Sequence, residues 1–145
     1  MNQHPIMKLK DNAQTATVEI NSPIEKVWEM WHNPADILHW NTFSPDWHTS
    51  HAENDPQPGG RFLFVIGLKD GSFSFNFEGT YKEVIPNQLL TYTLDDGRSS
   101  VIKFSAGNPV TITESFEPQD SDPIEYQKGA CQAVLNNLKA YTERK

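Results

Sequence analysis

Glu114 is the residue of this sequence with the clearest potential for acid–base chemistry. In the stretch VTITESF, Val110, Ile112 and Phe116 share one face of a predicted strand, and Glu114 falls on that same face. A carboxylate among apolar side chains has a raised pKa, because burial disfavours its charged form. Glu114 is therefore the candidate catalytic residue or a hydrogen-bonding anchor for a ligand. The alternative is a glutamate at a strand end that reaches water or pairs with a cation such as Arg98.

The other side chains capable of chemistry lack partners at a suitable spacing. His48 and His51 stand three residues apart in a predicted strand, so we expect them on opposite faces, and no cysteine or second carboxylate completes a set of metal ligands. Cys131 falls in the apolar stripe of the last predicted helix, which favours a core residue over a nucleophile. No phosphate-binding loop, nucleophile elbow or dinucleotide fingerprint occurs. The sequence predicts neither a metal nor a cofactor.

Composition limits the classes of partner. The 145 residues carry 12 Lys and Arg against 19 Asp and Glu, a net charge of −7. Nucleic acids and anionic membranes both require clustered positive charge, so we expect neither as a partner. A single cysteine excludes an internal disulfide, no apolar run approaches the ~20 residues of a membrane span, and the first twelve residues lack a signal-peptide core. The expected location is the cytoplasm.

Two helices are expected directly after the first strand. Residues 14–20, QTATVEI, alternate polar and apolar and predict a strand with one apolar face. In the following SPIE, Ser22 is expected to cap a helix that has proline in its first turn. That helix has an apolar stripe that includes Trp28 and Trp31. Asn33-Pro34 predicts the start of a second short helix through Leu38.

From about residue 47 to 117 the chain predicts antiparallel strands. Turn residues at Asp70-Gly71, Pro86-Asn87 and similar sites separate runs such as RFLFVIGL and SFSFNFEGTY. A hairpin centred on Asp70-Gly71 pairs Phe64 with Phe77, and pairing across Pro86-Asn87 sets Tyr81 beside Tyr92. One face of the sheet is therefore aromatic.

The last element is a helix of about twenty residues that begins at a second helix-start signal, Asp122-Pro123-Ile124-Glu125. Its apolar stripe must face the sheet. The expected fold class is α+β, a helix-grip fold in which a curved antiparallel sheet of about six or seven strands wraps around the long C-terminal helix. Residues 1–145 are expected to form one domain, with residues 1–12 as a flexible tail.

The space between the sheet and the last helix is expected to be either a cavity or a packed core. Tryptophans near the first two helices and alternate residues of the strands converge on it, although aromatic residues of this kind also fill packed cores. The candidate ligand-cavity residues are Trp31, Trp40, Trp47, Phe62, Phe64, Phe75, Phe77, Tyr81, Tyr92, Phe104, Ile112, Glu114, Ala130 and Val134.

The order and spacing of SPIEKVWEMW, LHW, PGGRFLF, DGSFSFNFEGTYKEVIPNQLLTYTL, TITESFE and GACQAVLNNLKAYTE resemble one family. It is the activator of heat-shock-protein-90 ATPase homologue family, of the START-like (Bet v 1-like, SRPBCC) superfamily that includes polyketide cyclases and lipid-transfer proteins. The resemblance covers residues 14–144. It implies a cavity between sheet and long helix that receives an apolar or aromatic small molecule.

Two departures from the family pattern matter. Family members commonly carry tryptophan after the glycine of the last helix, whereas Ala130 follows Gly129 here, which implies a larger or differently walled pocket. The eukaryotic chaperone activators place a further domain before this fold, and nothing in this sequence matches it. Stimulation of a chaperone is therefore the less favoured expectation.

The favoured function is binding of a hydrophobic or aromatic small molecule, lipid-like or polyketide-like, with one or two polar anchors. Binding without catalysis is expected over enzyme activity. Two alternatives stay open: a cyclase or hydrolase that uses Glu114 for proton transfer, and a stress-response domain that contacts a chaperone.

Overall fold

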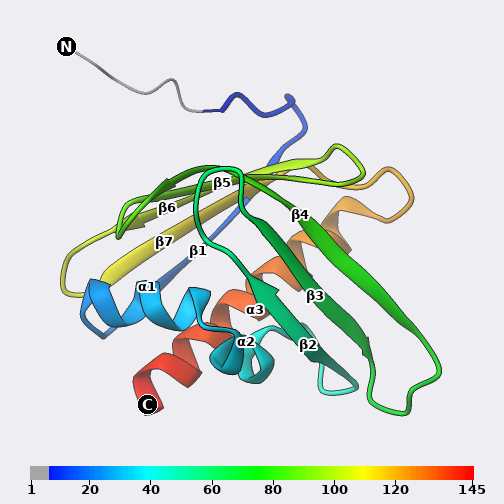
Figure 1. Cartoon of the computed structure of the whole chain (residues 1–145), viewed down its shortest axis with the longest axis horizontal. Helices are drawn as coiled ribbons and strands as arrows, with labels where there is room; N and C mark the ends of the chain where they lie inside the picture. Colours follow the sequence, from blue (N-terminus) through cyan, green and yellow to red (C-terminus); the bar gives the residue numbers. More distant parts are fainter. Residues whose placement is uncertain (1–6) are drawn as a thin grey trace.

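The computed structural model describes residues 7–145, and its main feature is a seven-stranded antiparallel sheet that curls around one long helix (Figure 1). In chain order, the elements are β1 (Gln14–Ile20), α1 (Ile24–His32), α2 (Pro34–Trp40), β2 (Trp47–Asn54), β3 (Arg61–Leu68), β4 (Ser74–Ile85), β5 (Leu89–Leu94), β6 (Ser99–Ser105), β7 (Val110–Phe116) and α3 (Ile124–Arg144).

The strands follow the order β1-β7-β6-β5-β4-β3-β2, so the first two strands of the chain form the two edges of the sheet. Helix α3 lies along the concave side, and α1 and α2 close one end of the fold (Figure 1). This arrangement confirms the predicted helix-grip fold, with the two short helices in their predicted place.

The predicted strand registers are confirmed in the aromatic hairpins. Phe64 pairs with Phe77 and Tyr81 pairs with Tyr92. The connection after β4 is one residue longer than predicted, because Ile85 pairs with Leu89. An extra residue between Tyr81 and Glu83 shifts the register by one and restores the predicted pairing.

The helix starts differ from the prediction. Helices α1 and α3 begin at Ile24 and Ile124, and their caps, Pro23 and Pro123, form no side-chain hydrogen bond to the helix. Capping by the side chain of Ser22 is therefore wrong: in both helices the proline stands at the cap position, one residue before the helix, not inside its first turn. Helix α2 does have a side-chain cap, because the Asn33 side chain accepts a hydrogen bond from the N–H of Ala35 (3.3 Å).

The C-terminal half of α3 is buried in the main core. Leu135 and Leu138 are fully buried and belong to one apolar cluster with Ile20, Val110 and Ile112. Each fully buried side chain of this size contributes roughly 1.5–3 kcal/mol relative to exposure. This cluster holds α3 against the sheet through the C-terminal half of the helix, where both of these leucines lie.

Of the flexible tail predicted at residues 1–12, residues 1–6 lie outside the described part of the chain. Within the remainder, the backbone N–H of Lys10 donates to the Glu117 side chain (2.9 Å). No helix among residues 7–145 combines the length and the apolar character that a membrane crossing demands.

Candidate ligand-binding cavity

A cavity of about 680 Å³ lies between the concave face of the sheet and the N-terminal half of α3. Thirteen of its 28 lining residues are aromatic. The structure places twelve of the fourteen predicted cavity residues on its wall: Trp31, Trp40, Trp47, Phe62, Phe64, Phe75, Phe77, Tyr81, Tyr92, Glu114, Ala130 and Val134.

The aromatic wall follows from strand periodicity. Alternate residues of β3, β4 and β5 point to the concave face, so their rings meet across the strand pairs. The ring of Phe62 lies 5.0 Å from that of Tyr92 and 5.1 Å from that of Tyr81, and Phe64 stacks on Phe77 at 6.4 Å. The rings cover the wall without filling the space beneath α3.

Phe104 and Ile112 do not line the cavity, and their assignment to it is wrong. Both are buried in the main core, and Phe104 packs against Trp28 and Trp31 of α1, with ring centroids 4.9 and 5.4 Å apart. They point to the concave face as predicted, but α1 and the C-terminal half of α3 fill the space there. Alternation along a strand predicts which face of the sheet a residue points to. It does not predict whether another element packs over that residue.

Several lining residues come from segments where no periodic pattern identifies them. The loop after α2 contributes three of them and the segment after β7 three more. The lining residues outside the predicted set are Asn41, Thr42, Phe43, Ile66, Phe73, Leu90, Leu94, Arg98, Ser100, Phe116, Glu117, Gln119, Asp122, Tyr126, Gln127 and Cys131. Of these, Ile66 and Leu94 share the predicted aromatic face and Phe116 shares the predicted face of Glu114, so all three could have been found by alternation.

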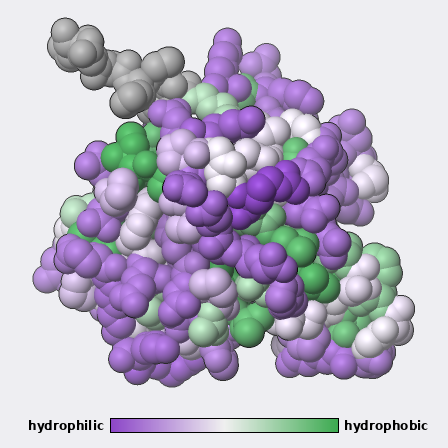
Figure 2. All heavy atoms as spheres, viewed as in Figure 1, coloured by the Kyte–Doolittle hydropathy of each residue, from purple (hydrophilic) through white to green (hydrophobic). Residues whose placement is uncertain are grey.

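Exposed aromatic rings surround one side of the cavity. Phe73, Phe75 and Tyr126 are 55%, 39% and 58% exposed, and all three line the cavity. Trp47 packs edge-on against both phenylalanines, and Phe43 connects Trp47 to Tyr126. We call these five residues the mouth cluster. Figure 2 shows a mainly hydrophilic face with apolar patches, including patches on the side of the β3–β4 hairpin.

Glu114 faces the cavity from β7. Burial raises the pKa of its carboxyl group to about 7, and a hydrogen bond from the Cys131 thiol opposes that shift. Its accessible surface belongs to the cavity wall. The alternative pairing with Arg98 is wrong, because the Arg98 guanidinium pairs with Asp96 at 2.9 Å. A carboxyl group that titrates near neutral pH can accept or donate a hydrogen bond to a bound molecule.

The polar tips of the other buried aromatic residues are occupied by protein partners. The Trp40 indole N–H donates to the Met30 carbonyl (2.9 Å), and the Tyr81 hydroxyl donates to the Asn54 side chain. Burial, with a smaller contribution from the nearby Glu114, raises the pKa of Tyr92, whereas its hydrogen bond to Ser100 opposes the shift. Tyr92 is therefore neutral at physiological pH.

Cys131 lies on the cavity wall, where burial and the neighbouring Glu114 raise the pKa of its thiol. A thiol with a raised pKa carries little thiolate and is a poor nucleophile. The residue serves the site as a neighbour of Glu114.

The histidines of β2 are arranged differently from the prediction. A bulge between Thr49 and His51 aligns His48 with Gly67 and His51 with Val65, so both histidines lie on the same, convex face. The expected opposite orientation is wrong, because a bulge adds one residue to the period. His51 pairs with Glu53 at 2.7 Å. Within residues 7–145, no three His, Cys, Asp or Glu side chains form a group that could hold a metal ion.

One family model and several solved structures match most of this chain. The family model described as Activator of Hsp90 ATPase homolog 1-like protein matches residues 21–143. The solution structure of the AHSA1-like protein from Aeromonas hydrophila is 34% identical, covers 90% of this chain and 93% of that chain, and has a TM-score of 0.82. Chr148 from Cytophaga hutchinsonii is 44% identical over 90% of this chain and 91% of that chain, with a TM-score of 0.78.

The Aha1 dimer from Colwellia psychrerythraea is 13% identical, covers 90% of this chain and 96% of that chain, and has a TM-score of 0.71, a likeness of fold alone. None of the curated proteins matches the chain.

Proposed function

The chain belongs to the family of Activator of Hsp90 ATPase homolog 1-like proteins, and from this premise we propose that it binds a small apolar or aromatic molecule in the cavity between the sheet and α3. The observation that carries the proposal is the cavity itself, about 680 Å³ with thirteen aromatic lining residues. Ligand pockets of small molecules typically measure about 300–1,000 Å³ and combine apolar walls with a few polar groups.

Aromatic walls favour a ligand with rings or a rigid apolar skeleton. Phenylalanine and tryptophan rings bind flat apolar groups through stacked and edge-on contacts, each worth about 0.5–1.5 kcal/mol beyond area burial. The polar atoms of Trp40 and Tyr81 are already bonded within the protein, so these side chains offer the ligand mainly apolar surface.

Ala130 provides the sharpest test of the proposal, because it lines the cavity at the position where the family commonly has tryptophan. N-phenyl-1-naphthylamine, a neutral dye that fluoresces in apolar sites, should bind the wild type saturably with one molecule per chain. An Ala130→Trp substitution places an indole in the cavity, and we expect it to weaken binding at least about tenfold, or 1.4 kcal/mol.

A Lys128→Trp variant is the matched control, because it adds the same indole to an exposed position of α3. Its affinity for the dye should stay within about twofold of the wild type. Absence of saturable binding, or equal affinity in the Ala130→Trp protein, would contradict the proposal.

A second candidate function is catalysis of proton transfer by Glu114. The observation in its favour is the carboxyl pKa of about 7, because a general acid or base works best near the operating pH. For any substrate that the wild type converts, Glu114→Gln should lower kcat by about 10²–10⁴-fold and leave dye affinity within about twofold. An unchanged kcat would remove this candidate.

The third candidate is a chaperone partner, as the family description implies. The mouth cluster supports it, because exposed aromatic groups are common at protein interfaces. Purified bacterial Hsp90 should then show a higher ATPase rate with the wild type than with a Phe73→Ser variant. No stimulation by the wild type would dismiss the idea. The cytoplasm, where such a partner resides, remains the proposed location.

A further inference from the structure

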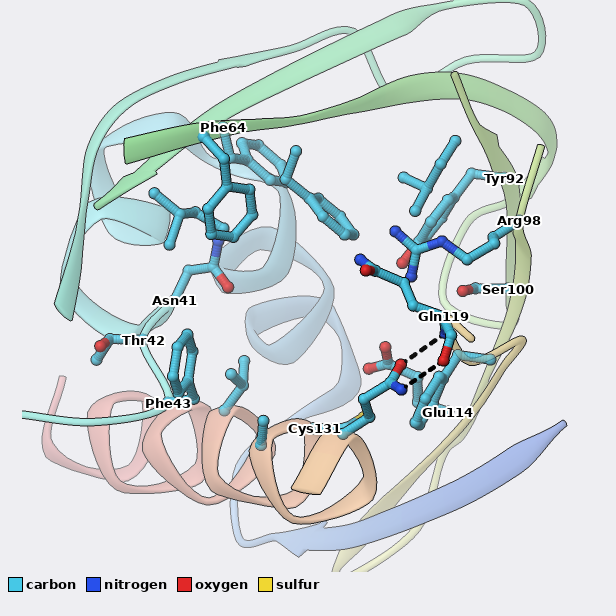
Figure 3. A pocket seen from close by; sticks show the side chains of 18 of the residues that line it. Asn41, Thr42, Phe43, Phe64, Tyr92, Arg98, Ser100, Glu114, Gln119 and Cys131 are labelled. Atoms are coloured by element: carbon cyan, nitrogen blue, oxygen red, sulfur yellow. Dashed lines mark hydrogen bonds between the residues drawn. The ribbon is translucent and has the colours of Figure 1, made fainter. Parts of the chain in front are cut away.

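The cavity has two chemically different sides (Figure 3). On one side, Phe64 lies near the loop residues Asn41, Thr42 and Phe43. On the other side, polar groups from β5, the turn after it, β6, β7, the segment after β7 and α3 gather together. The labelled residues of this polar side are Tyr92, Arg98, Ser100, Glu114, Gln119 and Cys131.

Most polar groups of that side already have protein partners. Arg98 pairs with Asp96 (2.9 Å), and the Gln127 amide bonds Gln119 through its backbone N–H (2.7 Å) and its carbonyl (2.8 Å). Glu117 accepts hydrogen bonds from two backbone N–H groups, those of Lys10 and Ser99. These groups already form hydrogen bonds or ion pairs within the protein, so they are poor anchors for a ligand.

Glu114 differs from them. Among residues 7–145, no lysine, arginine or histidine forms an ion pair with it, and its protein contact is the weak thiol donor of Cys131. Water in the cavity can satisfy the carboxyl group while the cavity is unfilled. An apolar ligand removes that water, and leaving the group unsatisfied costs about 1–3 kcal/mol.

The charges on the wall also disfavour anions. Glu114, Glu117 and Asp122 line the cavity against one basic residue, Arg98, which is already paired. A ligand carboxylate or sulfonate on this side would meet negative charge without a free cation.

We propose that the ligand is an uncharged ring compound with an O–H or N–H group at one end, and that this group donates a hydrogen bond to the Glu114 carboxyl while the rings occupy the aromatic side. This inference rests on the proposed ligand-binding function and names the class of ligand. It also fixes the orientation, with the donor end toward β7 and α3.

Three naphthalenes of one skeleton test the proposal by displacement of N-phenyl-1-naphthylamine at pH 7: 2-naphthol, 2-methylnaphthalene and 2-naphthoate. The quantity measured is the ratio of the Kd of 2-methylnaphthalene to that of 2-naphthol, in the wild type and in Glu114→Met. The difference in hydration between the two probes is the same for both proteins and cancels. We expect the ratio to be at least fivefold smaller in Glu114→Met, and 2-naphthoate to bind that variant at least fivefold more tightly than the wild type.

Two further variants separate loss of the carboxyl from loss of structure. Glu114→Gln keeps an acceptor oxygen and should retain at least half of the wild-type ratio. Glu19→Met makes the same exchange as Glu114→Met at an exposed position of β1 and should leave the ratio unchanged.

The outcomes are distinct. A ratio that falls less than fivefold in Glu114→Met, with 2-naphthol and 2-methylnaphthalene still displacing the dye, overturns this inference and leaves the proposed function intact. Tighter binding of 2-naphthoate than of 2-naphthol by the wild type also overturns it, because the cavity would then prefer an anion to an uncharged donor. If neither the dye nor any probe binds the wild type, the proposed function fails and the inference fails with it.

Discussion

Two glutamates on the cavity wall, Glu114 and Glu117, have different properties because their partners differ. Glu117 accepts hydrogen bonds from the backbone N–H groups of Ser99 (2.7 Å) and Lys10 (2.9 Å), so it connects three segments of the chain. Glu114 lacks comparable donors, and burial raises its pKa to about 7. Glu117 therefore joins segments of the fold, whereas the Glu114 carboxyl group has only the weak thiol donor of Cys131.

The titration of Glu114 should be visible in the stability of the fold. Its pKa is about 7 in the folded state and near its ordinary value of 4.5 in the unfolded chain. The folded state holds the proton more tightly. The contribution of Glu114 to stability should therefore be largest below pH 4.5 and be lost as the pH rises through about 7. The decrease corresponds to about 3 kcal/mol. The groups that face the carboxyl, Tyr92 of β5 and Cys131 of α3, have raised pKa values and stay neutral in this range.

Urea unfolding at pH 5 and pH 7.5 measures this effect. The free energy of unfolding of Glu114→Gln relative to the wild type should rise between the two pH values by about 2.4 kcal/mol. Glu19→Gln, on the exposed side of β1, should show no such change. A parallel pH dependence of wild type and Glu114→Gln would rule out the raised pKa.

At the scale of the elements, α3 has two functions along its length. Its C-terminal half buries Leu135 and Leu138 in the main core, while Ala130, Cys131 and Val134 line the cavity. One helix therefore stabilises the fold and forms a cavity wall. Substitutions near its N-terminal end should affect ligand binding more than stability.

Two glycines provide a matched test of how closely the elements pack. A Cβ at Gly79 of β4 would lie 2.5 Å from the Thr93 carbonyl oxygen and 3.1 Å from Cζ of Phe62, whereas a Cβ at Gly129 of α3 would meet nothing within 4 Å. Gly79→Ala should destabilise the fold by about 1–3 kcal/mol, because the cavity wall must move.

Gly129→Ala should instead stabilise the fold by about 0.5–1 kcal/mol, because alanine favours a helix. Chemical denaturation of both variants measures the two effects. Equal stability of the Gly79→Ala and wild-type proteins would contradict the close packing of β4 against β5.

At the scale of the whole molecule, the cavity is a region of the core that the chain leaves unfilled. The aromatic walls lose contacts that a ligand can restore, so binding and stability are coupled. The mouth cluster exposes rings on one side of this space, which suits the entry of an apolar molecule.

A ligand that binds the cavity should therefore raise the melting temperature. At a free concentration of 100 times its Kd, the stabilisation is about 2.7 kcal/mol. For a domain of this size, that corresponds to a rise of about 5–10 °C. Differential scanning calorimetry with N-phenyl-1-naphthylamine should show this rise in the wild type and a much smaller one in Ala130→Trp. An equal rise in both proteins would indicate binding outside the cavity.

Much of the fold and part of the candidate site could be predicted from the sequence. The pairing of Phe64 with Phe77 follows from alternation and one turn, which are local features. The contribution of Arg98 and Gln119 to the cavity could not be predicted, because both lie outside regular strands and their position depends on the packing of distant segments. No pattern of residues in β2 marks the position of its bulge, so the predicted orientation of His51 relative to His48 was wrong.

The sequence by itself determined the element order, the aromatic face of the sheet and the side to which Glu114 points, because side-chain direction repeats with the covalent geometry of strands and helices. Only the tertiary structure decided which part of that face is filled. Phe104 and Ile112 point the same way as Glu114, yet α1 and the C-terminal half of α3 cover them and leave Glu114 at an open space. The reason is physical: packing depends on where separate elements meet, and periodicity along the chain does not encode that position.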